Sequence, residues 1–297
     1  MNTHILNLLK ERKAANSLSE GAVMDYDWKY YMEDLKAGKA EARPTPEERE
    51  AAEDVLFRLP DDRKERIRSL IKGMLLNYRH QEGGDNAMVR DIMAAHAEYC
   101  RLLPGNELPR RRHNAVVYRY MMETARHNRA VAAKMAVSVK TVHNDIHQAI
   151  DEMAVLCFGL PASMEEPGTW QEGMESLLCN FLLLEKSKSI SRPLVWSNWQ
   201  QEREECLGIT GRALRCLERA VCMYEEFIAG ISFPDMQERA LEIVREVYFE
   251  GIGIPEAKDM HRISEATVYS DINKVTERFG ELAAFMAGNQ EGNERRK

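Results

Sequence analysis

The feature that most restricts the fold of this chain is the stretch NRAVAAKMAVSVKTVHNDIHQAI, residues 128–150. Apolar residues recur every three or four positions on both sides of Ala136-Val137, which predicts two amphipathic helices joined by a short turn. Ala132 is small enough to let the two helices cross closely, and the hydroxyl of Ser138 is suited to cap the second helix. This pattern predicts a helix-turn-helix.

The outer face of the second helix carries side chains that can hydrogen-bond to base edges in the major groove of duplex DNA. The candidate base contacts are Val139, Lys140, Thr141, His143, Asn144 and His147. The candidate phosphate contacts, which would position the protein on the duplex, are Arg110, Arg111, Arg112, Arg126, Arg129, Lys134 and Ser138. We expect Lys140 and Asn144 to contribute most to base recognition, because lysine can reach guanine and asparagine can pair with adenine through two hydrogen bonds.

The run VAAKMAVSVKTVHNDIHQAI resembles region 4 of sigma-70 family factors and the related phage late-gene regulators of the ArpU/RinA type. Their pattern is roughly I-A-x-x-L-G-V-S-x-x-T-V, and this chain departs from it with Met135 for Leu and Ala136 for Gly. The resemblance covers a small part of the chain and implies a DNA-binding module of the winged-helix-like superfamily that controls transcription in a bacterium or phage. It does not imply sigma activity, because no segment resembles the region that binds core polymerase and melts a promoter.

Basic residues are concentrated around this motif. Residues 110–147 hold eight Lys or Arg and two acidic residues, a net charge of +6, so the rest of the chain carries −13 within a total of −7. Contacts with phosphates release condensed counterions, and a local basic surface therefore favours DNA binding even in an acidic chain.

A second motif, AKDMHRISEATVYSDINKVTERF at residues 257–279, shares the string S-x-x-T-V-x-x-D-I with the first. Matching Ala257 and Met260 to Ala132 and Met135 shifts the register by one residue, which predicts a longer turn in the second motif. Its surroundings are less basic, since residues 254–278 hold four basic and five acidic residues.

Two interpretations of the second motif stay open. Either both motifs read half-sites on DNA, or the second has become a surface for packing or for a protein partner. Its candidate contacts are Arg262, Ser264, Thr267, Tyr269, Ser270, Asn273 and Lys274.

Composition predicts an all-α fold, because helix-forming residues dominate and alternating β-branched runs are nearly absent. We expect two helical domains, each containing a helix-turn-helix, joined by a Pro/Gly linker. The expected boundaries are an N-terminal helix and arm at 1–45, a helical domain at 46–160, a linker at 161–169, a second helical domain at 170–288 and a tail at 289–297.

Other kinds of site find little support in the sequence. His96 and Cys100 are spaced to share a helix face as metal ligands do, but no second pair follows, so we expect core residues and neither metal nor cofactor. The chain lacks a nucleophile elbow and a Gly-rich phosphate loop, so we expect no enzyme. It also lacks a signal peptide and the ~20-residue apolar run that crosses a membrane, so we expect a cytoplasmic, nucleoid-associated protein.

The main hypothesis is a sequence-specific transcriptional regulator that binds double-stranded DNA through a recognition helix at residues 138–150. RNA polymerase and a second copy of the chain are further candidate partners. One alternative is a phage DNA-packaging or replication assembly component. Another is an adaptor whose two motifs dock polymerase or another regulator.

Overall fold

The computed structural model describes residues 20–37, 44–56, 61–78, 84–103, 107–122, 127–159, 168–190, 194–195, 197–231 and 234–288. Residues 1–19, most of the expected linker, Arg126 and the expected tail lie outside these ranges. The first half contains α2 (Glu20–Lys36), α3 (Pro46–Glu53), η1 (Asp54–Leu56), α4 (Asp61–Asn77), α5 (Gly84–Arg101), α6 (Glu107–Val116), the π-helical turn η2 (Val117–Met121), α7 (Asn128–Met135) and α8 (Val139–Phe158). The second half contains α9 (Trp170–Ser189), η3 (Ser197–Trp199), α10 (Gln200–Gly230), α11 (Asp235–Val244), the π-helical turn η4 (Arg245–Phe249), α12 (Ile254–His261) and α13 (Glu265–Met286).

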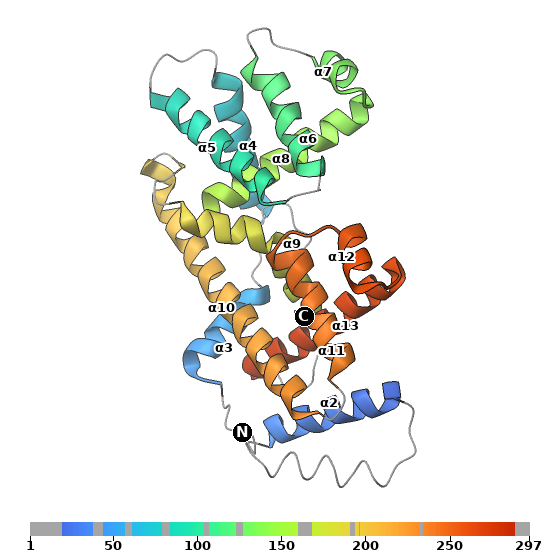
Figure 1. Ribbon diagram of the computed structural model, residues 1–297. Helices are drawn as coiled ribbons and strands as arrows, with labels where there is room; N and C mark the ends of the chain where they lie inside the picture. The colour runs from blue at the N-terminus through green and yellow to red at the C-terminus, as the bar shows by residue number, and fades with distance from the viewer. Residues whose placement is uncertain are drawn as a thin grey trace.

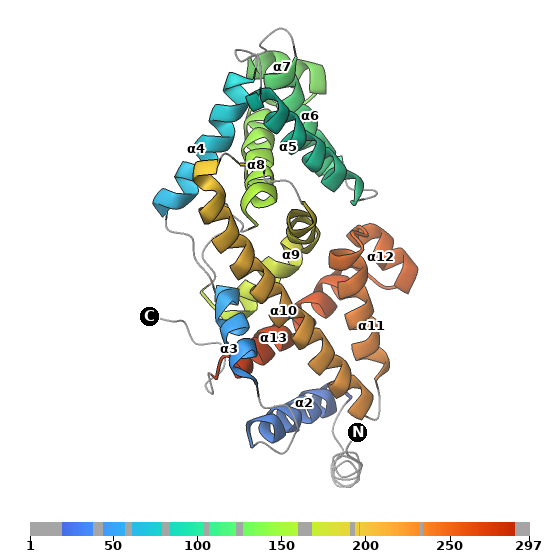
Figure 2. The same cartoon turned by 90° about the vertical axis from the view of Figure 1, so that its left-hand side faces the viewer.

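The described residues contain helices and no strands, which confirms the all-α prediction. The molecule is elongated, with α4 to α8 gathered at one end, α2 at the other, and α10 running along much of the length between them (Figures 1 and 2). None of the described helices combines the length and the apolar character needed to cross a membrane.

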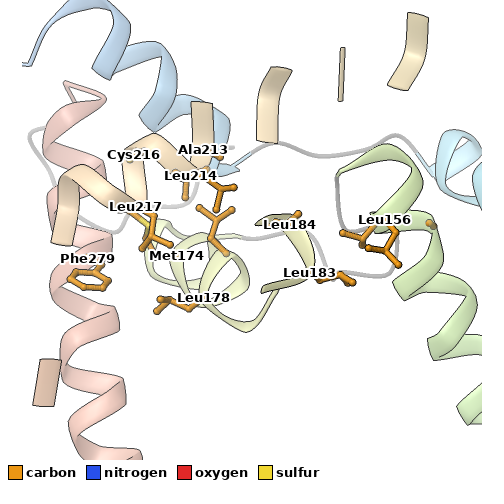
Figure 3. Packing of buried hydrophobic residues seen from close by; sticks show 14 of the residues in the cluster. Leu156, Met174, Leu178, Leu183, Leu184, Ala213, Leu214, Cys216, Leu217 and Phe279 are labelled. Atoms are coloured by element: carbon orange, nitrogen blue, oxygen red, sulfur yellow. The ribbon is translucent and has the colours of Figure 1, made fainter. Parts of the chain in front are cut away.

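One hydrophobic core continues through both halves of the chain. At the junction, Leu156 at the end of α8 lies near Leu183 and Leu184 of α9, and Leu214 of α10 lies close by (Figure 3). All four side chains are at most 2% exposed. Removing such apolar surface from water stabilises the junction by about 25 cal/mol per Å², so the two halves are joined by packing as well as by the chain.

The N-terminal arm is more ordered than the sequence suggested, because residues 20–36 form helix α2. Trp28 is buried and meets the ring of Phe227 of α10 edge-on, with 4.9 Å between ring centroids. Tyr31 donates a hydrogen bond to the carbonyl of Met223, at 3.0 Å. Helix α2, which lies within the expected N-terminal helix and arm, therefore packs on the second half of the chain.

Helix α3 starts at Pro46, the first residue of the expected helical domain. Thr45 and Glu48 form a reciprocal capping box at its N-terminus, and Pro46 occupies the first turn. The helix packs against α10, and Arg212 of α10 forms an ion pair with Asp54 just beyond the end of α3. The expected domain boundary at residue 46 therefore differs from the packing, since α3 belongs spatially to the second half.

The structure contains an internal repeat that extends well beyond the two motifs. We call residues 107–158 the first unit and residues 235–286 the second unit. Each has a helix, a π-helical turn, a short helix, a tight turn and a long helix, in that order. The units start 128 residues apart (107 and 235), and their long helices start 126 residues apart (139 and 265). The two-residue difference falls in the connection between the π-helical turn and the short helix.

The turns of the two motifs have the same length, so the prediction of a longer second turn was wrong. Residues 136–138 separate α7 from α8, and residues 262–264 separate α12 from α13. Ala257 therefore corresponds to Val131 rather than to Ala132. Met260, which is 53% exposed, does not correspond to the inward-facing Met135. The error came from matching small and apolar residue types instead of the positions at which the helices end.

Candidate nucleic-acid interface

Helices α7 and α8 of the first motif are joined by a short turn that backbone hydrogen bonds hold in place. Helix α7 ends at Met135, and Ala136 adopts the left-handed conformation with φ 54°. The amide of Val137 then donates to the carbonyl of Ala132, at 3.1 Å. Ser138 caps α8 by accepting a hydrogen bond from the amide of Thr141, at 3.0 Å. These bonds fix the angle at which α8 leaves the turn.

Substituting Ala136→Gly is expected to stabilise the protein by about 0.5–1 kcal/mol. The left-handed conformation costs an alanine about 1–2 kcal/mol, and the greater chain entropy of glycine offsets part of that gain. Urea unfolding followed by circular dichroism would measure the change. Ala133→Gly, at an exposed site inside α7, is the control and should destabilise by about 1 kcal/mol. Destabilisation by both variants would contradict the strain at Ala136.

The outer face of α8 is available to a partner in its first two turns. Lys140, His143, Asn144 and His147 are exposed, and Val139 is 46% exposed. Four side chains with hydrogen-bonding ends and one apolar side chain thus share one helical surface. This is the set of chemical groups that distinguishes base pairs in a major groove.

Thr141 and Ser138 are less available than the sequence suggested. Their hydroxyl oxygens lie 2.8 Å apart, and Ser138 also caps the helix. Thr141 is half-buried. Both side chains therefore hold the helix start in place, although Ser138 itself stays exposed.

His143 and His147 lie one turn apart, with Nε2 atoms 3.2 Å apart and ring centroids 4.3 Å apart. The pKa of His147 is lowered, first by burial and then by the nearby His143, Lys72 and Arg68. Lys72 and Arg68 come from α4, which packs on α8. This contribution could not be read from the sequence, because it is the packing of α4 on α8 that brings these cations close to His147.

Three of the predicted phosphate contacts have exposed side chains. Arg110, Arg129 and Lys134 are exposed on α6 and α7. The Lys134 ammonium lies 4.1 Å from the ring centroid of Tyr118, a cation–π contact that orients it beside the turn. All three cations lie on helices that precede α8 in the same unit.

Arg111 and Arg112 are engaged inside the protein, which corrects their assignment as phosphate contacts. The guanidinium of Arg111 makes two hydrogen bonds to the carboxylate of Asp145, at 2.8 and 2.9 Å. Arg112 forms an ion pair with Glu152. Asp145 is only 2% exposed. Both arginines therefore attach α6 to α8, and the local positive charge that can face DNA is smaller than the sequence count.

The second unit repeats this ion pair. Arg239 of α11 donates to Asp271 of α13, at 2.9 and 3.1 Å, and Asp271 is 3% exposed. The two pairs occupy corresponding positions in the units. Sequence reasoning noticed the shared aspartate but missed its role. The available signal was an acidic residue on the inner face of a helix, next to Ile146 or Ile272, where a carboxylate needs a partner.

The turn of the second motif has the same backbone geometry as the first. Arg262 adopts φ 54°, and Ser264 caps α13 by accepting from the amide of Thr267 at 3.1 Å. Arg262, Tyr269, Ser270, Asn273 and Lys274 are exposed.

The exposed chemistry of the second motif is different. The 126-residue offset places Glu265, Ala266, Tyr269, Ser270 and Asn273 where the first unit has Val139, Lys140, His143, Asn144 and His147. The two residues that we expect to read bases are thus replaced by alanine and serine. In addition, Lys258 lies 3.7 Å from carboxylates of both Asp259 and Glu265. The second motif keeps the fold of the first but lacks the lysine and the asparagine at these two positions.

Comparisons with models of known protein families, with curated proteins and with solved structures find no match for this chain.

Proposed function

We propose that this chain is a sequence-specific regulator of transcription that binds double-stranded DNA through the first motif. The observation that carries the proposal is the exposed face of α8, with Lys140, His143, Asn144 and His147 presented by a capped helix directly after a tight turn. In a helix-turn-helix of this geometry, the start of the second helix enters the major groove and the flanking elements contact the backbone.

Each group on this surface has a defined task in the proposed complex. Asn144 pairs with an adenine through two hydrogen bonds, and Lys140 reaches a guanine or a phosphate. The methyl groups of Val139 contact a thymine methyl. Arg110, Arg129 and Lys134 bind phosphates and set the register of α8 on the duplex. We assign DNA reading to the first motif because the second presents alanine and serine at the two key positions.

Sequencing of the DNA that the protein enriches from fragmented bacterial and phage genomes would test this proposal directly. We expect a single consensus, and we expect transcription from an adjacent promoter to change when the protein is added. Enrichment without a consensus would favour the adaptor function. A large oligomeric mass in light scattering, together with DNA binding that does not depend on sequence, would favour a packaging or replication assembly.

The salt dependence of binding should report the phosphate contacts one at a time. Replacing Arg129 by alanine is expected to weaken binding to all sequences equally and to reduce the slope of log K against log salt by about 0.9. The matched control is Arg215→Ala, which removes an exposed arginine from α10, far from α7. Fluorescence anisotropy at several salt concentrations would measure both. If Arg129→Ala and the unmodified protein had equal slopes, Arg129 would not be a phosphate contact.

A further inference from the structure

A cluster of metal-ligating side chains lies inside the first half, away from the exposed face of α8. His96 and Cys100 come from successive turns of α5, and His113 comes from α6. One ligand atom of each lies within 4.8 Å of those of the other two. His96 is fully buried and Cys100 is 3% exposed. The sequence alone showed only the pair on α5, because His113 is brought in by the packing of α6.

The contacts of His96 give its two ring nitrogens different roles. Its Nε2 lies 2.8 Å from a carboxylate oxygen of Glu152, which can only accept when ionised, so Nε2 carries the proton. Its Nδ1 therefore presents a lone pair, and this atom lies 3.0 Å from Nδ1 of His113. A carboxylate that accepts from the far nitrogen of a metal-binding histidine is the usual arrangement around zinc.

The ligand set also fits the size and preference of zinc. Zinc binds imidazole nitrogen at about 2.0–2.1 Å and thiolate sulfur at about 2.3 Å, which places tetrahedral neighbours about 3.3–3.6 Å apart. The Nδ1 atoms of His96 and His113 are 3.0 Å apart, near this spacing, and the Cys100 sulfur lies within 4.8 Å of a ligand nitrogen of each histidine. A mixed nitrogen and sulfur set of this kind favours zinc over magnesium or calcium.

The internal repeat provides a comparison within the same chain. The 128-residue offset places the buried Leu241 where the first unit has His113, and the 126-residue offset places Arg278 where it has Glu152. The second unit therefore folds with an apolar residue at the histidine position. The histidine and the glutamate of the first unit are therefore not required by the fold that the two units share.

We propose that His96, Cys100 and His113 bind one zinc ion, with Glu152 positioning His96 and a water molecule as the fourth ligand. Binding forms two zinc–nitrogen bonds and one zinc–sulfur bond, and the thiol proton of Cys100 passes to solvent. The ion connects α5 to α6, and through Glu152 to α8, so it stabilises the half that carries the exposed recognition face. This site is independent of the proposed DNA binding.

The test uses the full chain, purified with zinc and also loaded with cobalt(II) as a coloured substitute. We expect one metal ion per chain and a thiolate-to-cobalt charge-transfer band in the near ultraviolet. Cys100→Ser should abolish the band and lower the zinc content at least about tenfold. The control Cys222→Ser removes an exposed cysteine of α10 and should change neither. Glu152→Gln should keep the band and weaken cobalt affinity about 10–100-fold.

The unmodified protein alone can decide the matter if a variant fails to fold. Added zinc should raise its thermal unfolding midpoint and a chelator should lower it, whereas magnesium should do neither. Protein that was incubated with excess zinc or cobalt(II), yet binds no metal and gives no charge-transfer band, would overturn the proposal. The contact between His96 and His113 would then be a plain hydrogen bond. Loss of the band in Cys222→Ser would overturn it as well.

Discussion

Replacing Lys140 and Asn144 together by alanine is expected to weaken specific DNA binding at least about 30-fold, because each good base contact contributes about 1–3 kcal/mol. Both side chains are exposed on α8 and point away from the core, so the helical circular dichroism and the unfolding midpoint should stay unchanged. Electrophoretic mobility shifts on the enriched consensus and on an unrelated sequence would separate specific from non-specific binding.

The matched control lies in the second motif. Ser270→Ala combined with Lys274→Ala removes a hydroxyl and a cation from the corresponding face of α13, and affinity should change less than about twofold. An equal loss in both double variants would mean that both motifs contact DNA. Normal binding by the Lys140 and Asn144 variant would exclude α8 as the recognition helix.

Removing Arg111 is expected to destabilise the protein by about 3–5 kcal/mol, because it leaves the carboxylate of Asp145 buried and unpaired. The reverse deletion should cost less. The Arg111 side chain is 36% exposed, so in Asp145→Ala the guanidinium can turn toward water. Urea unfolding of Arg111→Ala and Asp145→Ala would show this asymmetry.

Two further variants serve as a parallel case and as a control for the Arg111→Ala measurement. Arg239→Ala breaks the corresponding ion pair with the buried Asp271 and should destabilise by a similar amount. Arg110→Ala removes the exposed neighbour of Arg111 and should change the free energy of unfolding by less than about 0.5 kcal/mol. If Arg111→Ala behaved like Arg110→Ala, the ion pair would contribute nothing to stability. In that case Arg111 would again be a candidate phosphate contact.

The sequence predicted the local parts of the fold well. The start of α3 at Thr45, the turn at Ala136 and the cap at Ser138 are all set by residues within a few positions of one another. Such signals act over one helical turn and can be read without knowing the tertiary structure. The exposed face of α8 follows from the same periodicity.

The parts that sequence reasoning missed depend on contacts between distant segments. The count of +6 treated every arginine as available, yet Arg111 and Arg112 turn inward to carboxylates of α8. His113 joins His96 and Cys100 only after α6 packs on α5. Likewise, Trp28 reaches the rings of α10 from nearly two hundred residues away in the chain. Composition and spacing carry no information about which faces meet.

Helix α8 begins with the exposed face that carries Lys140 and Asn144 and ends, twenty residues later, in the core between the two halves. One continuous helix thus has an exposed surface at its start and buried apolar side chains at its end. If the second motif binds a partner, DNA or protein, the fold sets the distance and the angle between that partner and the exposed face of α8. Partners that bind both motifs would then have to match this fixed spacing. If both partners are DNA half-sites, we expect their separation to follow the helical repeat of about 10–10.5 base pairs.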